Sequence, residues 1–253
     1  MAGGATRQLP LLDEGDIAPA GLREVVGDTR AGDTAADDHC PRSVRARVHR
    51  RTIRPVTGAK DYLQLSVAEL LDEIAARTPA PAGGSVAAIA LTAAAALVTM
   101  AARFSEGHWE EAGAAIAQAE ALRARAAPLA EADAEAYERA LRALQAPKVG
   151  DAGERNAAIG RALEDAAAVP LRIAEIGADV ATLAAEVAEH GNPNLRGDAA
   201  AAAELGAAAA TIGAGLVRIN LGATKNDERV ARGKELSAAA TKSTTRARAA
   251  AFS

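Results

Sequence analysis

The loop Thr78-Pro-Ala-Pro81-Ala-Gly83-Gly84-Ser85 carries the residue types best suited to binding a ligand. Its two prolines fix the backbone, its two glycines leave space beside the chain, and Ser85 is placed to cap a helix predicted to start at Val86. The free N–H groups at the start of that helix, with the positive end of its dipole, suit a carboxylate, a phosphate or a polarised carbonyl. Taken alone, the loop also fits a plain turn between two helices, and that simpler interpretation holds until further motifs join it.

The uncharged run that follows the loop, Val86 to Ala102, predicts a helix buried on all sides. A helix that is apolar all round needs other helices around it, so we expect this one at the centre of a bundle. The run is at the short limit for a membrane span, and its many alanines contribute little to insertion. Residues 1–16 also lack the apolar core of a signal peptide. We therefore expect a cytoplasmic protein without a membrane partner.

The composition favours closely packed helices and argues against two kinds of site. Of the 253 residues, 49% are apolar but only 2% are aromatic, and alanine, the best helix former, supplies most of the apolar share. The net charge of −4 comes from interspersed acids and bases, which gives no electrostatic footprint for nucleic acid over the main body. Cys40 is the only cysteine, and only His108 and His190 fall in the predicted helical body, so neither a metal cluster nor histidine-based catalysis is indicated.

The chain divides into two regions that differ in periodicity. Residues 1–61 mix Gly, Asp, Arg, Thr and Pro without a helical or strand pattern, and we expect a disordered leader there. Residues 62–253 form the predicted helical domain. It opens with a capping box, Ser66 with Glu69, at the start of a short helix that ends at Thr78.

Further helices are predicted at Trp109 to about Gln145, Glu154 to about His190, Ala199 to Leu221 and, more polar and on the outside, Asp227 to about Ala250. Pro128 should kink or divide the first of these, and Pro170 should interrupt the second. Asp198 is well placed to cap the third, in which Gly206 and Gly213 share one face and let a neighbouring backbone approach. No segment alternates like a strand. The predicted fold class is therefore all-α, a bundle of long antiparallel helices around the central Ala-rich apolar helix.

Three separated stretches carry a family resemblance. They are Thr78 to Ala88, then Asp133-Ala-Glu-Ala-Tyr137 with Ala146-Pro-Lys148, then Gly191-Asn-Pro-Asn-Leu-Arg-Gly-Asp198 with Arg218-Ile-Asn220. In this order along a helical chain they resemble the cyclodeaminase/cyclohydrolase family of folate one-carbon metabolism, found alone or as the C-terminal domain of formiminotransferase-cyclodeaminase. The resemblance covers about Leu65 to Ala250. The chain departs from the family pattern at Ala82, where a third glycine is usual, and at Gly197, where a serine is usual.

The resemblance implies one of two reactions at a single carbon of tetrahydrofolate. In a cyclodeaminase, the arylamine nitrogen attacks the formimino carbon and ammonia leaves; in a cyclohydrolase, water adds to the methenyl carbon and the ring opens to formyl-tetrahydrofolate. Both pass through a tetrahedral carbon that bears three heteroatoms. The starting carbon already carries positive charge, so the site needs a carboxylate and hydrogen-bond donors, with no metal or organic cofactor. The sequence does not choose between the two substrates.

The residues that the resemblance assigns to this chemistry fall into two groups. The catalytic group is Asp133, Asp198 and Lys148, and the substrate-binding group is Pro81, Gly83, Gly84, Ser85, Tyr137, Asn192, Asn194 and Asn220. Without the resemblance, Asp133 would be interpreted as one acid on a solvated face and Asp198 as a simple helix cap. The family builds its sites around a dimer of such bundles, so a homodimer is expected. The alternative is a non-catalytic relative that binds folate or acts as a helical scaffold.

Overall fold

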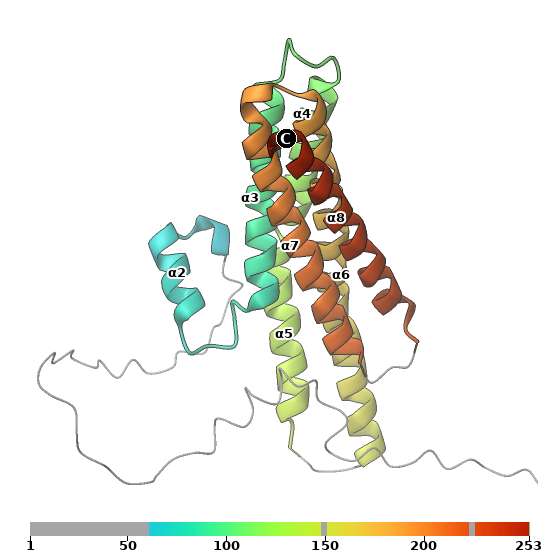
Figure 1. The fold of residues 1–253 in the computed structure, drawn as a ribbon. Helices are drawn as coiled ribbons and strands as arrows, with labels where there is room; N and C mark the ends of the chain where they lie inside the picture. Colours follow the sequence, from blue (N-terminus) through green and yellow to red (C-terminus); the bar gives the residue numbers. More distant parts are fainter. Residues whose placement is uncertain (1–60, 148–150, 223–225, 253) are drawn as a thin grey trace, which may run out of the picture.

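The protein is described over residues 61–147, 151–222 and 226–252 of a computed structural model (Figure 1). Its elements are η1 (Tyr62–Gln64), α2 (Val67–Ala75), α3 (Gly83–Arg103), α4 (Ala112–Ala126), α5 (Leu129–Gln145), α6 (Ala152–His190), η2 (Pro193–Leu195), α7 (Arg196–Leu221) and α8 (Glu228–Phe252). Over these ranges the structure contains no strand, so the all-α prediction is confirmed. The predicted leader lies outside the described residues, apart from its last residue, Asp61.

The helix boundaries confirm some of the predicted signals and correct others. Ser66 and Glu69 form the expected capping box, and the chain divides at Pro128, between α4 and α5. Ser85 is not the cap of α3, because the helix already begins at Gly83 and Ala82 is its N-cap. Asp198 is likewise not a cap, because α7 begins at Arg196 and places Asp198 in its first turn. The glycines near each start, Gly83 and Gly84 in α3 and Gly197 in α7, lie within the first helical turn.

Helices α6 and α7 pack along a seam of small residues, in which the predicted close approach at two glycines is confirmed. A Cβ atom at Gly213 would lie 2.5 Å from the carbonyl oxygen of Pro170, and one at Gly206 would lie 3.0 Å from the carbonyl oxygen of Gly177. A side chain at Gly213 would collide with the backbone of α6, and one at Gly206 would require that backbone to shift slightly. The glycines therefore let two backbones meet where larger residues would hold them apart.

We expect Gly213→Ala to lower the free energy of unfolding by about 1–3 kcal/mol, because the methyl group would collide with rigid backbone rather than with a flexible side chain. Urea denaturation would measure the change. Gly160→Ala is the matched control, since a Cβ there meets nothing within 4 Å in the described structure. That variant should gain up to about 1 kcal/mol from helix propensity. Equal stability of the two variants would contradict the close packing of α6 on α7.

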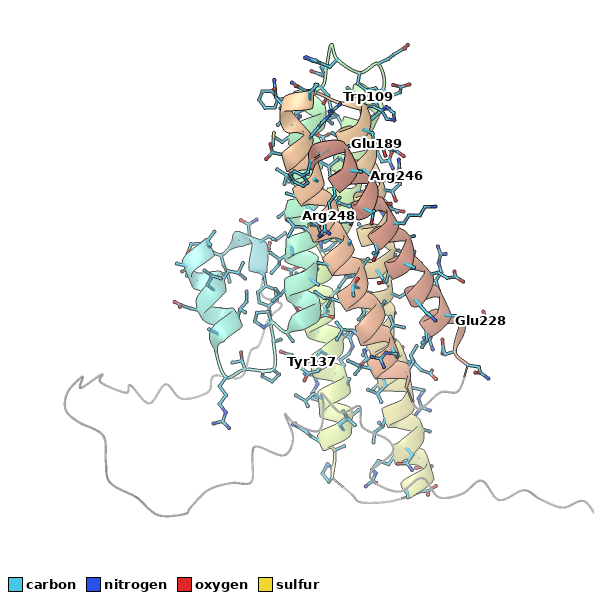
Figure 2. All side chains as sticks on the ribbon, in the orientation of Figure 1. Trp109, Tyr137, Glu189, Glu228, Arg246 and Arg248 are labelled. Atoms are coloured by element: carbon cyan, nitrogen blue, oxygen red, sulfur yellow. The ribbon has the colours of Figure 1, made fainter. Side chains whose placement is uncertain are left out.

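Helix α8 covers the α6–α7 pair from outside, as its polar sequence predicts. Two arginines in its last turns connect α8 to both helices through ion pairs. Arg246 donates to both carboxylate oxygens of Glu189 on α6, and Arg248 pairs with Glu204 on α7 (Figure 2). Helix α8 thereby lines one side of the bundle over most of its length.

Helix α3 packs against α4, α5, α6 and α7, but its predicted place at the centre of the bundle is not confirmed. Ala93 is exposed, and one side of the helix reaches the surface. By length and composition, α3 and the segment Pro193–Leu221 are the two candidate membrane spans of the described residues, and about half of each apolar stretch is buried inside the bundle. Such half-buried helices are typical of a helical core that also has an apolar outer face.

Candidate active site

The first turn of α3 meets Asp133 in the second turn of α5. The Ser85 hydroxyl donates to the Asp133 carboxylate with an Oγ–Oδ2 distance of 3.0 Å, and the Ser85 side chain is fully buried. A Cβ atom at Gly84 would lie 2.5 Å from Asp133 Cγ. The N-terminus of α3, expected to receive an anion from a ligand, therefore already faces an anion of the chain itself.

A small cavity of about 190 Å³ opens beside this carboxylate. Its walls come from α3, α5, α6 and α7, and its lining consists of Ala82, Gly83, Gly84, Asp133, Tyr137, Ala166, Pro170, Leu216, Ile219 and Asn220. The predicted partners Asp133 and Tyr137 thus share one cavity with the glycines of the loop, as the resemblance implies. Pro81 is buried behind the loop, and Lys148 lies outside the described residues.

Burial sets the protonation behaviour of the cavity. Asp133 is only 7% exposed, and loss of solvent raises the pKa of its carboxyl, while hydrogen bonds from the Ser85 hydroxyl and backbone N–H act in the opposite direction. Burial, and then the charge of Asp133, raises the pKa of the Tyr137 phenol. Tyr137 therefore stays protonated and can donate a hydrogen bond, and Asp133 is better suited to exchange a proton than an ordinary surface carboxyl.

Pro170 shapes the wall of the cavity without breaking its helix. Proline has no N–H, so the carbonyl of Ala166, four residues earlier, loses its normal helical partner. The Asn220 amide of α7 donates to that carbonyl over 3.0 Å, and α6 continues unbroken from Ala152 to His190. The prediction that Pro170 interrupts the helix is wrong for this reason. Asn220 still offers its amide oxygen to a ligand in the cavity.

The remaining predicted residues lie at the opposite end of the bundle. The Asn192 amide donates to the Phe104 carbonyl over 3.0 Å, and the Asn192 backbone N–H donates to the Ser105 hydroxyl over 2.9 Å, both at the C-terminal end of α3. Since Ser85 and Ser105 are twenty residues apart on one helical path, this end is about 30 Å from Asp133. In Figure 2, Trp109 lies near the upper end of the bundle and Tyr137 lies in its lower half.

Within one chain, Asn192, Asn194 and Asp198 therefore do not join the cavity. Asn192 accepts a hydrogen bond from the Asn194 backbone N–H over 3.0 Å, so both ends of its side-chain amide serve the turn. Sequence reasoning also missed four lining residues, Ala166, Pro170, Leu216 and Ile219. Only Pro170 had a signal, because a proline within a helical pattern leaves a carbonyl that needs a new donor.

Comparison with known proteins decides the family. A family model described as formiminotransferase-cyclodeaminase matches residues 66–239, which is more than half of the chain. The chain belongs to this family. The resemblance drawn from the three motifs is thereby confirmed, and Asp133, Tyr137 and the loop glycines lie within the matched region.

The relatives of this formiminotransferase-cyclodeaminase family member carry the names of folate one-carbon enzymes. A methenyltetrahydrofolate cyclohydrolase from Methylorubrum extorquens is 34% identical over 145 residues, which span 54% of this chain and 70% of that protein. A formimidoyltransferase-cyclodeaminase from Sus scrofa is 35% identical over 140 residues, which span 52% of this chain but only 26% of that protein. The crystal structure of formiminotetrahydrofolate cyclodeaminase from Thermotoga maritima has a TM-score of 0.67 and 27% identity, and the match covers 74% of this chain and 96% of that one.

Proposed function

We propose that this protein is a folate one-carbon enzyme that acts on methenyl-tetrahydrofolate as a cyclohydrolase or on formimino-tetrahydrofolate as a cyclodeaminase. The observation that carries the proposal is the buried Asp133 carboxylate, held against the glycine turn of α3 at the cavity. We also expect the enzyme to work in the cytoplasm, without a metal or an organic cofactor and without a nucleic-acid or membrane partner.

The residues of the cavity fit the needs of either reaction. Ionised Asp133 stabilises the cationic carbon, and its raised pKa suits it to accept a proton from the attacking water or amine and return it to the leaving nitrogen. Tyr137 and the free amide oxygen of Asn220 supply one donor and one acceptor for the edge of the pterin. The glycine turn lets the planar ring approach the backbone closely.

The direct test follows the absorbance of methenyl-tetrahydrofolate with purified protein. Decay well above the uncatalysed rate supports the cyclohydrolase, and ammonia release from formimino-tetrahydrofolate supports the cyclodeaminase. Folate binding without turnover of either compound would favour the non-catalytic alternative.

A stripe along α7 supports a homodimer. Four residues spaced by seven, Asp198, Leu205, Ile212 and Ile219, share one face of the helix, and the three apolar ones are 39%, 41% and 37% exposed. We call these four residues the α7 stripe. Exposed leucine and isoleucine at a coiled-coil spacing are typical of a helix that pairs with another helix.

We infer that two copies pair along this stripe in antiparallel orientation about a twofold axis. The stripe has Asp198 at one end and Ile219, a cavity residue, at the other, about 32 Å away along the helix. A twofold axis near its middle, at the small exposed Ala208, brings Asp198 of the partner subunit to the Ile219 end. The two groups of predicted residues, separated within one chain, would then meet between two chains.

We therefore expect mixed dimers to restore activity that pure variants lack. Asp133→Asn and Asp198→Asn should each be inactive alone, but a mixed dimer contains one site with both carboxylates intact. Random mixing should return about a quarter of the parental kcat, because half of the dimers are mixed and each holds one good site. A light-scattering mass would check the dimer. No recovery on mixing, or a monomeric mass, would contradict the antiparallel pairing.

A further inference from the structure

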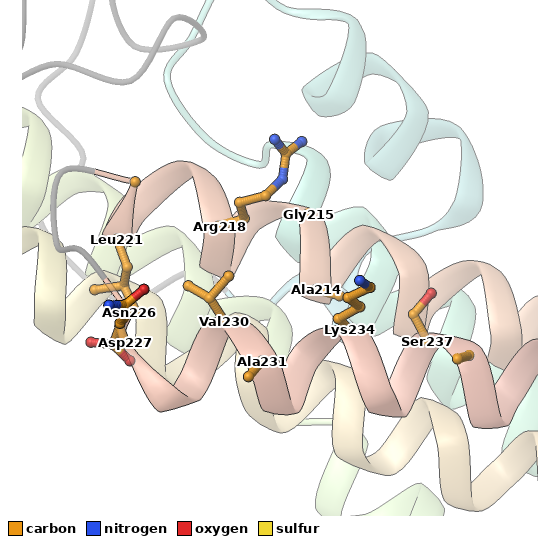
Figure 3. A pocket seen from close by; sticks show the side chains of 12 residues that line it. Ala214, Gly215, Arg218, Leu221, Asn226, Asp227, Val230, Ala231, Lys234 and Ser237 are labelled. Carbon is orange, nitrogen blue, oxygen red and sulfur yellow. The ribbon is translucent and has the colours of Figure 1, made fainter.

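A second and larger cavity, of about 840 Å³, lies where the end of α7 meets the first half of α8. Its lining is Ala214, Gly215, Arg218, Leu221, Gly222, Asn226, Asp227, Val230, Ala231, Lys234, Ser237 and Ala238. Figure 3 shows Lys234 and Ser237 between the two helices and Arg218 extending from α7 on the side away from α8. The floor of the cavity is therefore apolar, and basic and hydroxyl groups lie around its edge.

The charges of this cavity are not balanced. Its acid, Asp227, is held by Arg229, with Nε and Nη2 at 3.0 Å and 2.8 Å from the two carboxylate oxygens, and this hydrogen bonding lowers the pKa of Asp227. Arg218 and Lys234 form no ion pair with any acid of the described residues. Lys234 between the helices and Arg218 at the rim of the cavity, on the side of α7 away from α8, thus present two positive charges without an ion-pair partner among the described residues, and these favour an anionic ligand.

The two cavities lie beside the same last turns of α7. Leu216, Ile219 and Asn220 line the Asp133 cavity, whereas the neighbouring Gly215 and Arg218 line the larger one. A folate is a drug-sized ligand, which needs about 300–1,000 Å³, so the 190 Å³ beside Asp133 can hold only its reacting part. The rest of the molecule must leave along a neighbouring surface.

We propose that the cavity between α7 and α8 binds the glutamate carboxylates of the folate substrate, with Arg218 and Lys234 as the positioning charges. This inference rests on the proposed function. The substrate would place its one-carbon unit at Asp133, pass the last turn of α7, and end with its carboxylates at Arg218 and Lys234. Arg218 can contact a carboxylate with two parallel N–H groups, and Lys234 adds a point charge.

The test compares two substrates on two variants. With methenyl-tetrahydrofolate, Arg218→Gln and Lys234→Gln should each raise KM by roughly 3-fold to 5-fold, as expected for exposed charge pairs, and leave kcat within about twofold. With the matching substrate that lacks the glutamate, the parent should already show the raised KM and the variants should change nothing further. Lys242→Gln is the matched control, because Lys242 is an exposed lysine of α8 outside the cavity.

A direct binding measurement separates this inference from the proposed function. Calorimetry with p-aminobenzoyl-glutamate should detect binding to the parent and weaker binding to Arg218→Gln, even if the protein turns over no folate. Equal KM values for parent and variants, with turnover intact, would overturn the glutamate site alone. Competition by inorganic phosphate as strong as that by p-aminobenzoyl-glutamate would also overturn it, because the cavity would then select no carboxylate.

Discussion

Asp133→Asn should lower kcat by roughly 10²-fold or more and leave substrate affinity much less changed. The amide keeps the size of the side chain and can still accept from Ser85, but it can neither neutralise the cationic carbon nor carry a proton. Steady-state kinetics on methenyl-tetrahydrofolate would measure both parameters. The control is Glu135→Gln on the same helix. Glu135 is half exposed, and its Oε2 lies 3.8 Å from Nη1 of Arg139 one turn later, so its charge serves only a surface contact.

The neighbouring Glu131 cannot serve as a second control. Its carboxylate accepts the backbone N–H of Tyr62 over 2.7 Å and so holds η1 against α5. If Asp133→Asn and Glu135→Gln both keep kcat within a few-fold of the parent, the proposed mechanism loses its central residue.

The Asp133→Asn variant should not lose stability at neutral pH. Burial raises the folded-state pKa of Asp133 above its unfolded value, so its favourable contribution is present in acid and is lost as pH rises through the folded pKa. The substituted amide carries no charge to desolvate, so the melting temperature of the variant at neutral pH should equal or exceed that of the parent. This advantage should shrink as pH falls. If the variant instead lost activity because it unfolds, its melting temperature at neutral pH would lie below that of the parent.

Gly84→Ala should reduce kcat by roughly 10²-fold although it adds one methyl group. The new Cβ would lie 2.5 Å from Asp133 Cγ, so the carboxylate must move and loses its alignment with Ser85 and with the substrate. Alanine also gains up to about 1 kcal/mol of helix propensity over glycine, which offsets part of the collision. We therefore expect a small change in melting temperature beside a large change in kcat.

Gly113→Ala on α4 is the matched control for that substitution. A Cβ there meets nothing within 4 Å among the described residues, so kcat should stay at the parental value and stability should hold or rise. If Gly84→Ala keeps its activity as Gly113→Ala does, the close contact between α3 and the carboxylate has no catalytic role. A parallel loss of fold and activity in Gly84→Ala would instead support a plain structural turn.

The sequence predicted the helices well because their signals are local. The capping box at Ser66, the division of the chain at Pro128 and the end of α6 at His190 each depend on a few neighbouring residues. The prediction that Ser85 caps α3 was wrong because a serine hydroxyl can either cap its own helix or donate to a neighbouring one. Only the position of α5 decides between these two roles. Ser85 donates to a residue 48 positions away rather than to its own helix. No local pattern contains that information.

The site was predicted in part, for a similar reason. Asp133 and Tyr137 are one turn apart on α5, so their common cavity follows from helix geometry once the family motif is noticed. The role of Asn220 depends on Pro170 of another helix, because the unpaired carbonyl and its donor are brought together only by packing. The distance between Asp198 and Asp133 likewise depends on which ends of the helices are adjacent, a question of topology rather than of spacing.

The small side chains along the α6–α7 seam also affect how the fold responds to temperature. An alanine buries much less apolar surface than leucine or phenylalanine, so a core that consists largely of alanine exposes less apolar area to water when it unfolds. The heat capacity of unfolding rises with exposed apolar area and averages about 12–15 cal/mol/K per residue. In this protein the heat capacity of unfolding per residue should fall below that range. A smaller heat capacity change gives a flatter stability curve, so the bundle should keep a nearly constant stability from cold to warm conditions.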